Sequence, residues 1–118
     1  MATVVAAMSG VPFQQLVATT TGTGTVLAIP MSFRNHTWII TGAAGITAGS
    51  VQIETGTDPT LDTGTWAAVG AAVTPLASTD LLVQATGIFE FLRARVATTI
   101  SGGGAPSVTV TYIGGKSF

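Results

Sequence analysis

The sequence predicts an all-β fold, an antiparallel β-sandwich or jelly roll of about eight strands with little or no helix. Short runs of β-branched and aromatic residues recur between clusters of Gly, Pro, Ser and Thr, which is the pattern of strands separated by turns. No window shows a sustained apolar repeat of about 3.6 residues, so helices are not expected. A chain of 118 residues can close one core, which indicates a single domain.

The first half of the chain contains four of these runs. In the third, Trp38 and Ile40 share one face, because side chains alternate along a strand. In the fourth, Val51 and Ile53 point inward, and Gln52 and Glu54 point outward. The segment 43–49 is expected to be a turn. The four expected strands are residues 13–18, 25–29, 36–41 and 50–55.

The second half contains four more runs. We expect residues 56–64 to form a loop and the Gly-rich segment 101–106 to connect the last two strands as a hairpin. The alanines of segment 67–73 favour a helix by propensity, but Gly70 at its centre argues against one. The expected strands are residues 66–73, 81–84, 88–97 and 107–113.

Residues 1–12 precede the first strand, and we expect them to form an N-terminal arm beside a β-sandwich domain of residues 13–118. The arm is apolar for a free tail, since it contains Val4, Val5, Met8 and Val11. We therefore expect it to pack on a neighbouring subunit. Disorder of the terminus is the alternative.

Charged residues make up 8% of the chain, against roughly 25% in a typical soluble domain. The mean hydropathy is +0.60. Four Lys and Arg residues are too few to neutralise a row of phosphates, so no nucleic-acid partner is expected. No run of about 18 apolar residues is present, so no membrane partner is expected either. Assembly with other protein subunits is the remaining way to cover so uncharged a surface.

The sequence contains no convincing set of catalytic residues. There is no Cys, and His36 is the only histidine, so we expect no enzyme, no catalytic residue, no cofactor and no metal. Glu54, Asp58 and Asp62 could offer oxygen atoms to Ca²⁺, but the two aspartates fit the start and end of a turn better.

A second interface candidate lies on the expected strand 88–97. In a regular strand Phe89, Phe91, Arg93 and Arg95 share one face, and aromatic and Arg side chains are enriched at protein interfaces. The alternative is that the arginines form ion pairs within the chain, with Glu54, Asp80 or Glu90.

The two tryptophans leave a carbohydrate-binding function open. Trp38 and Trp66 could stack on sugars, as in lectin-like modules. Both occupy core-type positions in their strands, so burial is the favoured interpretation.

Three segments together resemble small β-sandwich virion proteins of tailed bacteriophages, of the capsid decoration (cement) type. In such proteins a "VQIEGS-D" strand leads to a Trp strand, and a "RFLRARV" strand precedes a final "VTVTLIG" strand. Glu90 departs from the pattern, since such strands often carry a small, aromatic or basic residue there. The segments are 50–58 (SVQIETGTD) with 65–69 (TWAAV), 87–96 (GIFEFLRARV) and 107–114 (SVTVTYIG).

The resemblance implies a structural protein on the capsid surface of a virion. Its expected partners are subunits of the major capsid protein, with self-association into trimers or dimers. By capping junctions between these subunits it would stabilise the phage head against internal DNA pressure. The alternatives are a carbohydrate- or receptor-binding β-sandwich module and a tail or connector component.

Overall fold

The computed structural model describes residues 4–57 and 66–115. This part of the chain contains nine strands and no helix, and no segment of it could cross a membrane as a helix. The strands are Val4–Ala6 (β1), Phe13–Thr19 (β2), Val26–Ala28 (β3), Asn35–Gly42 (β4), Ile46–Gly56 (β5), Trp66–Ala68 (β6), Asp80–Thr86 (β7), Phe91–Gly102 (β8) and Val108–Gly115 (β9).

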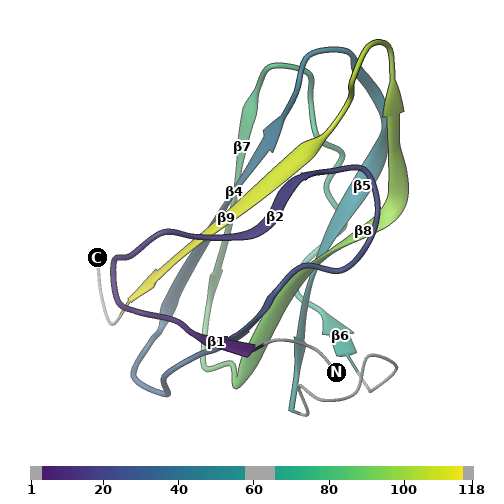
Figure 1. Ribbon diagram of the computed structural model, residues 1–118. Helices are drawn as coiled ribbons and strands as arrows, with labels where there is room; N and C mark the ends of the chain where they lie inside the picture. Colours follow the sequence, from purple (N-terminus) through teal and green to yellow (C-terminus); the bar gives the residue numbers. More distant parts are fainter. Residues whose placement is uncertain (1–3, 58–65, 116–118) are drawn as a thin grey trace.

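The strands form two sheets that lie face to face as a sandwich (Figure 1). Sheet A has the order β1-β3-β8-β5-β6, and sheet B has the order β2-β9-β4-β7. All pairs are antiparallel except β1 with β3, which is parallel. The all-β sandwich expected from the sequence is confirmed.

The core lies between the sheets and is built from the inward positions of the long strands. Trp38 and Ile40 of β4 are fully buried, as the alternation of the sequence predicts. Val51 and Ile53 of β5 face them from sheet A and are also buried. At roughly 1.5–3 kcal/mol for each fully buried large apolar side chain, this alternation supplies most of the driving force for folding.

One polar side chain crosses the core and joins the two sheets. Gln15 of β2 is 3% exposed, and its Oε1 accepts a hydrogen bond from Trp38 Nε1 at 2.9 Å. Its Nε2 donates to the carbonyl oxygens of Leu92 at 3.0 Å and Thr25 at 3.2 Å. Because buried polar groups are costly unless they are paired, this side chain favours one alignment of the sheets.

Several strand limits differ from those expected. β5 begins at Ile46, inside the segment expected to be a turn, because Ile46 is itself a buried core residue. β6 ends at Ala68, before Gly70 with its φ of +72°, and only Val73 makes a further bridge, to Val51. β8 starts at Phe91 rather than at Ile88 and continues to Gly102. The expected hairpin at residues 101–106 is wrong, because β8 and β9 lie in different sheets and their connection crosses from one sheet to the other.

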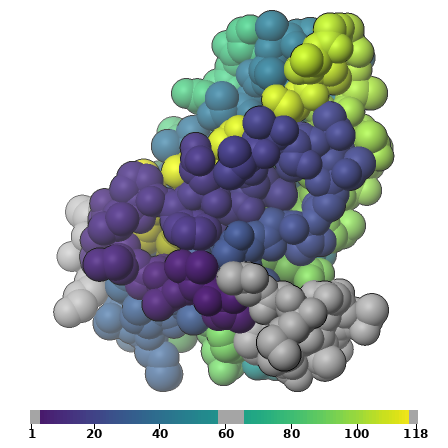
Figure 2. Space-filling model, viewed as in Figure 1, coloured from purple at the N-terminus to yellow at the C-terminus, as the bar shows by residue number. Residues whose placement is uncertain are grey.

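The N-terminal segment belongs to the sandwich. β1 pairs with β3 of the same chain, so that Val4 lies beside Val26. Ala7, which follows, is 8% exposed and donates its backbone N–H to the carbonyl oxygen of Ala28. In Figure 2 the N-terminal residues, in purple, lie against the body of the molecule. Residues 4–12 are therefore ordered on their own domain, and packing on a neighbouring subunit stays a prediction.

Candidate functional site

His36 is buried, and both of its ring nitrogen atoms have hydrogen-bond partners. Its side chain is buried on β4, with its ring 5.0 Å from that of Phe89. Nε2 lies 3.0 Å from the carbonyl oxygen of Gly87, which can only accept, so Nε2 carries the proton. Nδ1, 2.7 Å from the hydroxyl of Tyr112, then accepts from that group. Burial lowers the pKa of His36, with a smaller opposing effect from the Gly87 carbonyl, and burial raises the pKa of Tyr112.

The outer face of sheet A carries a charged cluster. Glu54 of β5 lies directly opposite Arg93 of β8. Its Oε1 accepts hydrogen bonds from Arg93 Nε at 2.9 Å and Arg95 Nε at 3.3 Å. The Glu54 and Arg93 side chains are 9% and 10% exposed, and that of Arg95 is 37% exposed. The structure shows that both arginines form ion pairs within the chain, with Glu54 as the partner, and their part in an interface stays a prediction.

Trp66 completes this cluster. The guanidinium carbon of Arg93 lies 4.1 Å from the centroid of the Trp66 ring, a cation–π contact. Trp66 is half-buried on β6, whereas Trp38 is fully buried in the core. The aromatic side chains in residues 4–57 and 66–115 are buried or half-buried, and the carbohydrate-binding alternative stays a prediction.

Phe89 differs from its predicted position. It precedes β8, and its ring contacts His36 and packs against the core, so it does not share the outer face of Arg93 and Arg95. The backbone reverses direction here because Gly87 adopts a φ of +129°, which breaks the strand alternation assumed from the sequence. Phe91 does keep that alternation, and it is half-buried.

Exposed apolar side chains gather at one end of the sandwich, which we call the apolar end. They lie in loops: Met8 and Val11 before β2, Met31 between β3 and β4, and Ile88 between β7 and β8. Their exposed fractions are 65%, 47%, 75% and 50% for Met8, Val11, Met31 and Ile88.

Backbone hydrogen bonds hold these loops together. Gly10 N donates to Gly114 O at 2.8 Å, and Arg34 N donates to Gly115 O at 2.9 Å, so two loops join the end of β9. Gly87 N in turn donates to Arg34 O at 3.0 Å, which adds the loop before β8. The apolar end is thus a pre-formed surface and not a set of separate loops.

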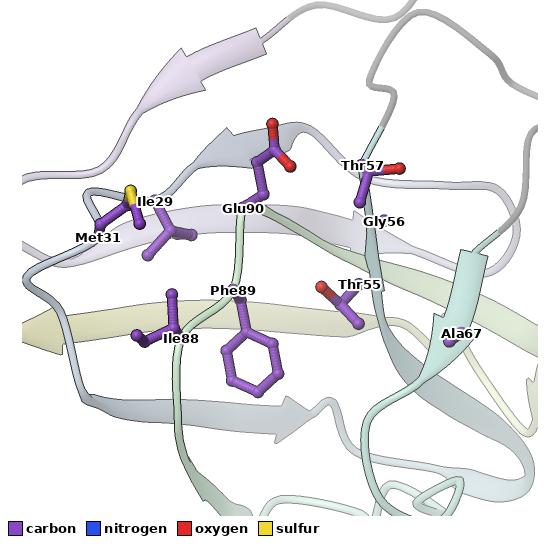
Figure 3. A pocket seen from close by; sticks show the side chains of 9 residues that line it. All are labelled: Ile29, Met31, Thr55, Gly56, Thr57, Ala67, Ile88, Phe89 and Glu90. Carbon is purple, nitrogen blue, oxygen red and sulfur yellow. The ribbon is translucent and has the colours of Figure 1, made fainter.

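A groove of about 910 Å³ opens at this end (Figure 3). The Glu90 side chain points away from the Phe89 ring, so that a carboxylate marks one side of the groove and an aromatic ring the other. Thr55 at the end of β5 is held by a hydrogen bond from its Oγ1 to Phe91 O. The lining residues are Ile29, Met31, Thr55, Gly56, Thr57, Ala67, Ile88, Phe89 and Glu90.

The structure brings some of the predicted interface residues together and leaves others apart. Val4 and Val5 of β1 lie beside β3, and β3 pairs with the start of β8 at Phe91. Met8, Val11 and Phe89 belong to the apolar end or its groove, whereas Arg93 and Arg95 lie on the outer face of sheet A. Sequence reasoning missed Met31 and Ile88. The signal for both was a large apolar residue directly after Pro30 or Gly87, where turns are usually polar.

No group of three or more potential metal ligands occurs within the described ranges. Of the three acidic residues considered for Ca²⁺, Glu54 is held by the two arginines. Asp58 and Asp62 lie outside the described residues.

No family model, no curated protein and no solved structure matches this chain.

Proposed function

We propose that this chain is a structural virion protein, and more specifically a capsid decoration protein that binds the outer surface of a phage head and stabilises it. The observation that carries the proposal is the apolar end, where Met31 and Ile88 stand exposed beside a groove of about 910 Å³. Exposed apolar surface next to a groove is typical of a protein docking site. The resemblance of segments 50–58, 87–96 and 107–114 to decoration proteins supports the same function.

The binding would use a pre-folded surface. Backbone hydrogen bonds tie two loops of the apolar end to β9 and the third to Arg34, so docking would cost little conformational entropy. We expect the groove to receive apolar side chains at a junction between subunits of the major capsid protein. A protein that contacts several subunits at once links them, and this would resist the outward pressure of packaged DNA.

The test uses heads from a phage that carries this gene and from which the gene has been deleted. The purified chain is expected to co-sediment with these heads, saturably and in a fixed ratio to the capsid subunits. Heads with bound protein should also withstand higher temperatures before they release DNA.

Two variants locate the binding surface. Ile88 in the groove and Leu76 in the loop before β7 are exposed to the same extent, 50% and 51%. Ile88→Asp is expected to abolish co-sedimentation, and Leu76→Asp is the matched control that should bind normally. A wild-type chain that ignores the heads would contradict the proposal. A glycan array and isolated phage tails would then test the carbohydrate-binding and tail alternatives.

A further inference from the structure

The four sheet edges in the described part of the chain differ in how well they are protected. β1 and β6 at the edges of sheet A are three residues long each. β2 at one edge of sheet B has two register shifts and a positive φ of 43° at Ala18. Short or irregular edge strands resist pairing with other chains. β7, at the other edge of sheet B, has seven residues in unbroken register with β4.

The alternation of hydrogen-bonded pairs between β4 and β7 shows which backbone N–H and C=O groups of β7 do not bond to β4. Gly42 N donates to Thr79 O at one end, and Gly87 N donates to Arg34 O at the other. Hydrogen-bonded pairs alternate along an antiparallel ladder, so Leu81, Val83 and Ala85 direct their N–H and C=O groups to β4. The residues that direct them outward are Asp80, Leu82, Gln84 and Thr86. Within residues 4–57 and 66–115 no other backbone group bonds to them.

This edge also lacks the usual side-chain protection. β7 contains no Lys, no Pro and no bulge. Its single charge, Asp80, stands at the first position and accepts a hydrogen bond from Thr41 Oγ1 at 2.8 Å. Leu82 at the middle is 66% exposed. A regular edge of this length, with its single charge at one end, is a template for another strand.

We propose that two copies of this chain pair through antiparallel β7 strands, with Val83 of one copy opposite Val83 of the other. In this register all four outward residues meet outward residues: Leu82 lies opposite Gln84 of the second copy, and Asp80 lies opposite Thr86. Sheet B then continues across a two-fold axis into the sheet B of the second copy. The inference rests on the β7 edge alone and is independent of capsid binding.

The side chains of β7 favour a second copy as the occupant. The two Asp80 carboxylates lie at opposite ends of the joint ladder, so no like charges face each other. On the inner face, Leu81 lies opposite the small Ala85, and Val83 lies opposite itself. On the outer face Leu82 is already next to Ile39 of β4, and Leu82 of the second copy lies diagonally across the two-fold axis from it.

Substitutions at the edge test the pairing, with the oligomeric state of the full chain measured by size-exclusion chromatography with light scattering. Leu82→Lys is expected to weaken the dimer by at least about tenfold, because the two new cations approach across the axis. Val17→Lys is the matched control, since Val17 is 62% exposed on β2 at the opposite edge of the same sheet. Gln84→Pro removes an outward N–H without touching the β4–β7 ladder, and it should also yield monomers.

A cross-link tests the register. The chain contains no cysteine, so Val83→Cys introduces a single thiol. Directly opposed Cα atoms at a non-hydrogen-bonded pair are about 4.5 Å apart, within the range of a disulfide. Under mild oxidation Val83→Cys should form covalent dimers, whereas Ala85→Cys, whose two copies are offset along the ladder, should not. A monomeric or trimeric wild-type chain, or a dimer that survives both Leu82→Lys and Gln84→Pro, would overturn the inference.

Discussion

The pair of His36 and Tyr112 shows how a single histidine can serve the fold. The neutral ring accepts from one neighbour and donates to another, so both of its nitrogen atoms are satisfied inside the core. A protonated ring would have two donors, and Nδ1–H could pair with Tyr112 only if the hydroxyl turned to accept. Together with burial, this makes the charged form of His36 unfavourable in the folded protein.

This environment predicts a loss of stability in mild acid. The pKa of His36 is lowered from its ordinary value of 6.5, so the unfolded chain binds a proton that the folded chain does not. The contribution of His36 to the free energy of unfolding is therefore fully present above pH 6.5 and is lost as the pH drops below it. The limiting slope for one proton is about 1.4 kcal/mol per pH unit. Urea unfolding between pH 7.5 and pH 5 measures this slope.

His36→Asn is the control for that measurement. The variant loses ring packing and should be less stable at every pH, but its stability should no longer fall between pH 6.5 and pH 5. An unchanged slope would assign the titration to another group.

At high pH the dependence of stability on pH has the opposite direction. Because the pKa of Tyr112 is raised, the free energy of unfolding should fall as the pH rises above 10.

Arg93 and Arg95 share one carboxylate oxygen but differ in burial. Arg93→Ala leaves Glu54, which is 9% exposed at its side chain, without its closest partner, and removes the contact with Trp66. The expected cost is about 3 kcal/mol, the lower end of the range for breaking a buried pair. Arg95→Ala removes an arginine that is 37% exposed and should cost less than about 1 kcal/mol. Equal losses in chemical denaturation would show that burial does not distinguish the two pairs.

At the scale of elements, two glycines in the connections between the sheets separate two requirements of a turn. Gly45, between β4 and β5, has a φ of +90°, and a Cβ there would overlap the carbonyl oxygen of Gly103. Gly103, across from it, has open space around its own Cβ position. Gly45→Ala is expected to destabilise the protein by at least about 2 kcal/mol.

Gly103→Ala is the matched control and should change the free energy of unfolding by less than about 1 kcal/mol in either direction. Thermal unfolding of the two variants beside the wild type provides the comparison. A tolerated Gly45→Ala would mean that the connection between β4 and β5 can move away from that between β8 and β9.

Strand alternation was predictable from the sequence wherever a strand is regular. It placed Trp38 and Ile40 inward in β4, and Leu92 inward and Arg93 outward in β8. It failed at Phe89, because Gly87 reverses the backbone before the strand begins. Such a reversal depends on backbone angles that local residue types do not determine.

Contacts between distant segments were harder to predict than strands. Glu54 was one of three candidate partners for the arginines, and only the β5–β8 register selects it. The role of Gln15 was not predicted, since a polar residue in a strand is normally assigned to the outer face. The groove was missed as well, because it is formed by three loops and two strands that are far apart in sequence.

For the whole molecule, the scarcity of charge has a consequence for binding. Only 8% of residues are charged, and the apolar end contributes Met8, Val11, Met31 and Ile88 to the surface. Association through this surface would be driven by the burial of apolar area, which salt does not screen.

Binding to phage heads is therefore expected to change by less than about threefold between about 0.1 M and about 1 M NaCl, although the Debye length falls from about 10 Å to about 3 Å. Co-sedimentation at the two salt concentrations measures this. A steep loss of binding in high salt would indicate that charges such as Glu90 and Arg95 dominate the interface.

The position of β9 determines when the protein can fold during its synthesis. This strand, Val108–Gly115, lies between β2 and β4 in sheet B, so those two strands have no direct ladder with each other. Until residue 115 has left the ribosome, β2 cannot join the sheet, and the pair of β4 and β7 remains a two-stranded ribbon. Until then the nascent chain exposes unpaired strand edges, and this is the period in which a chaperone would protect it.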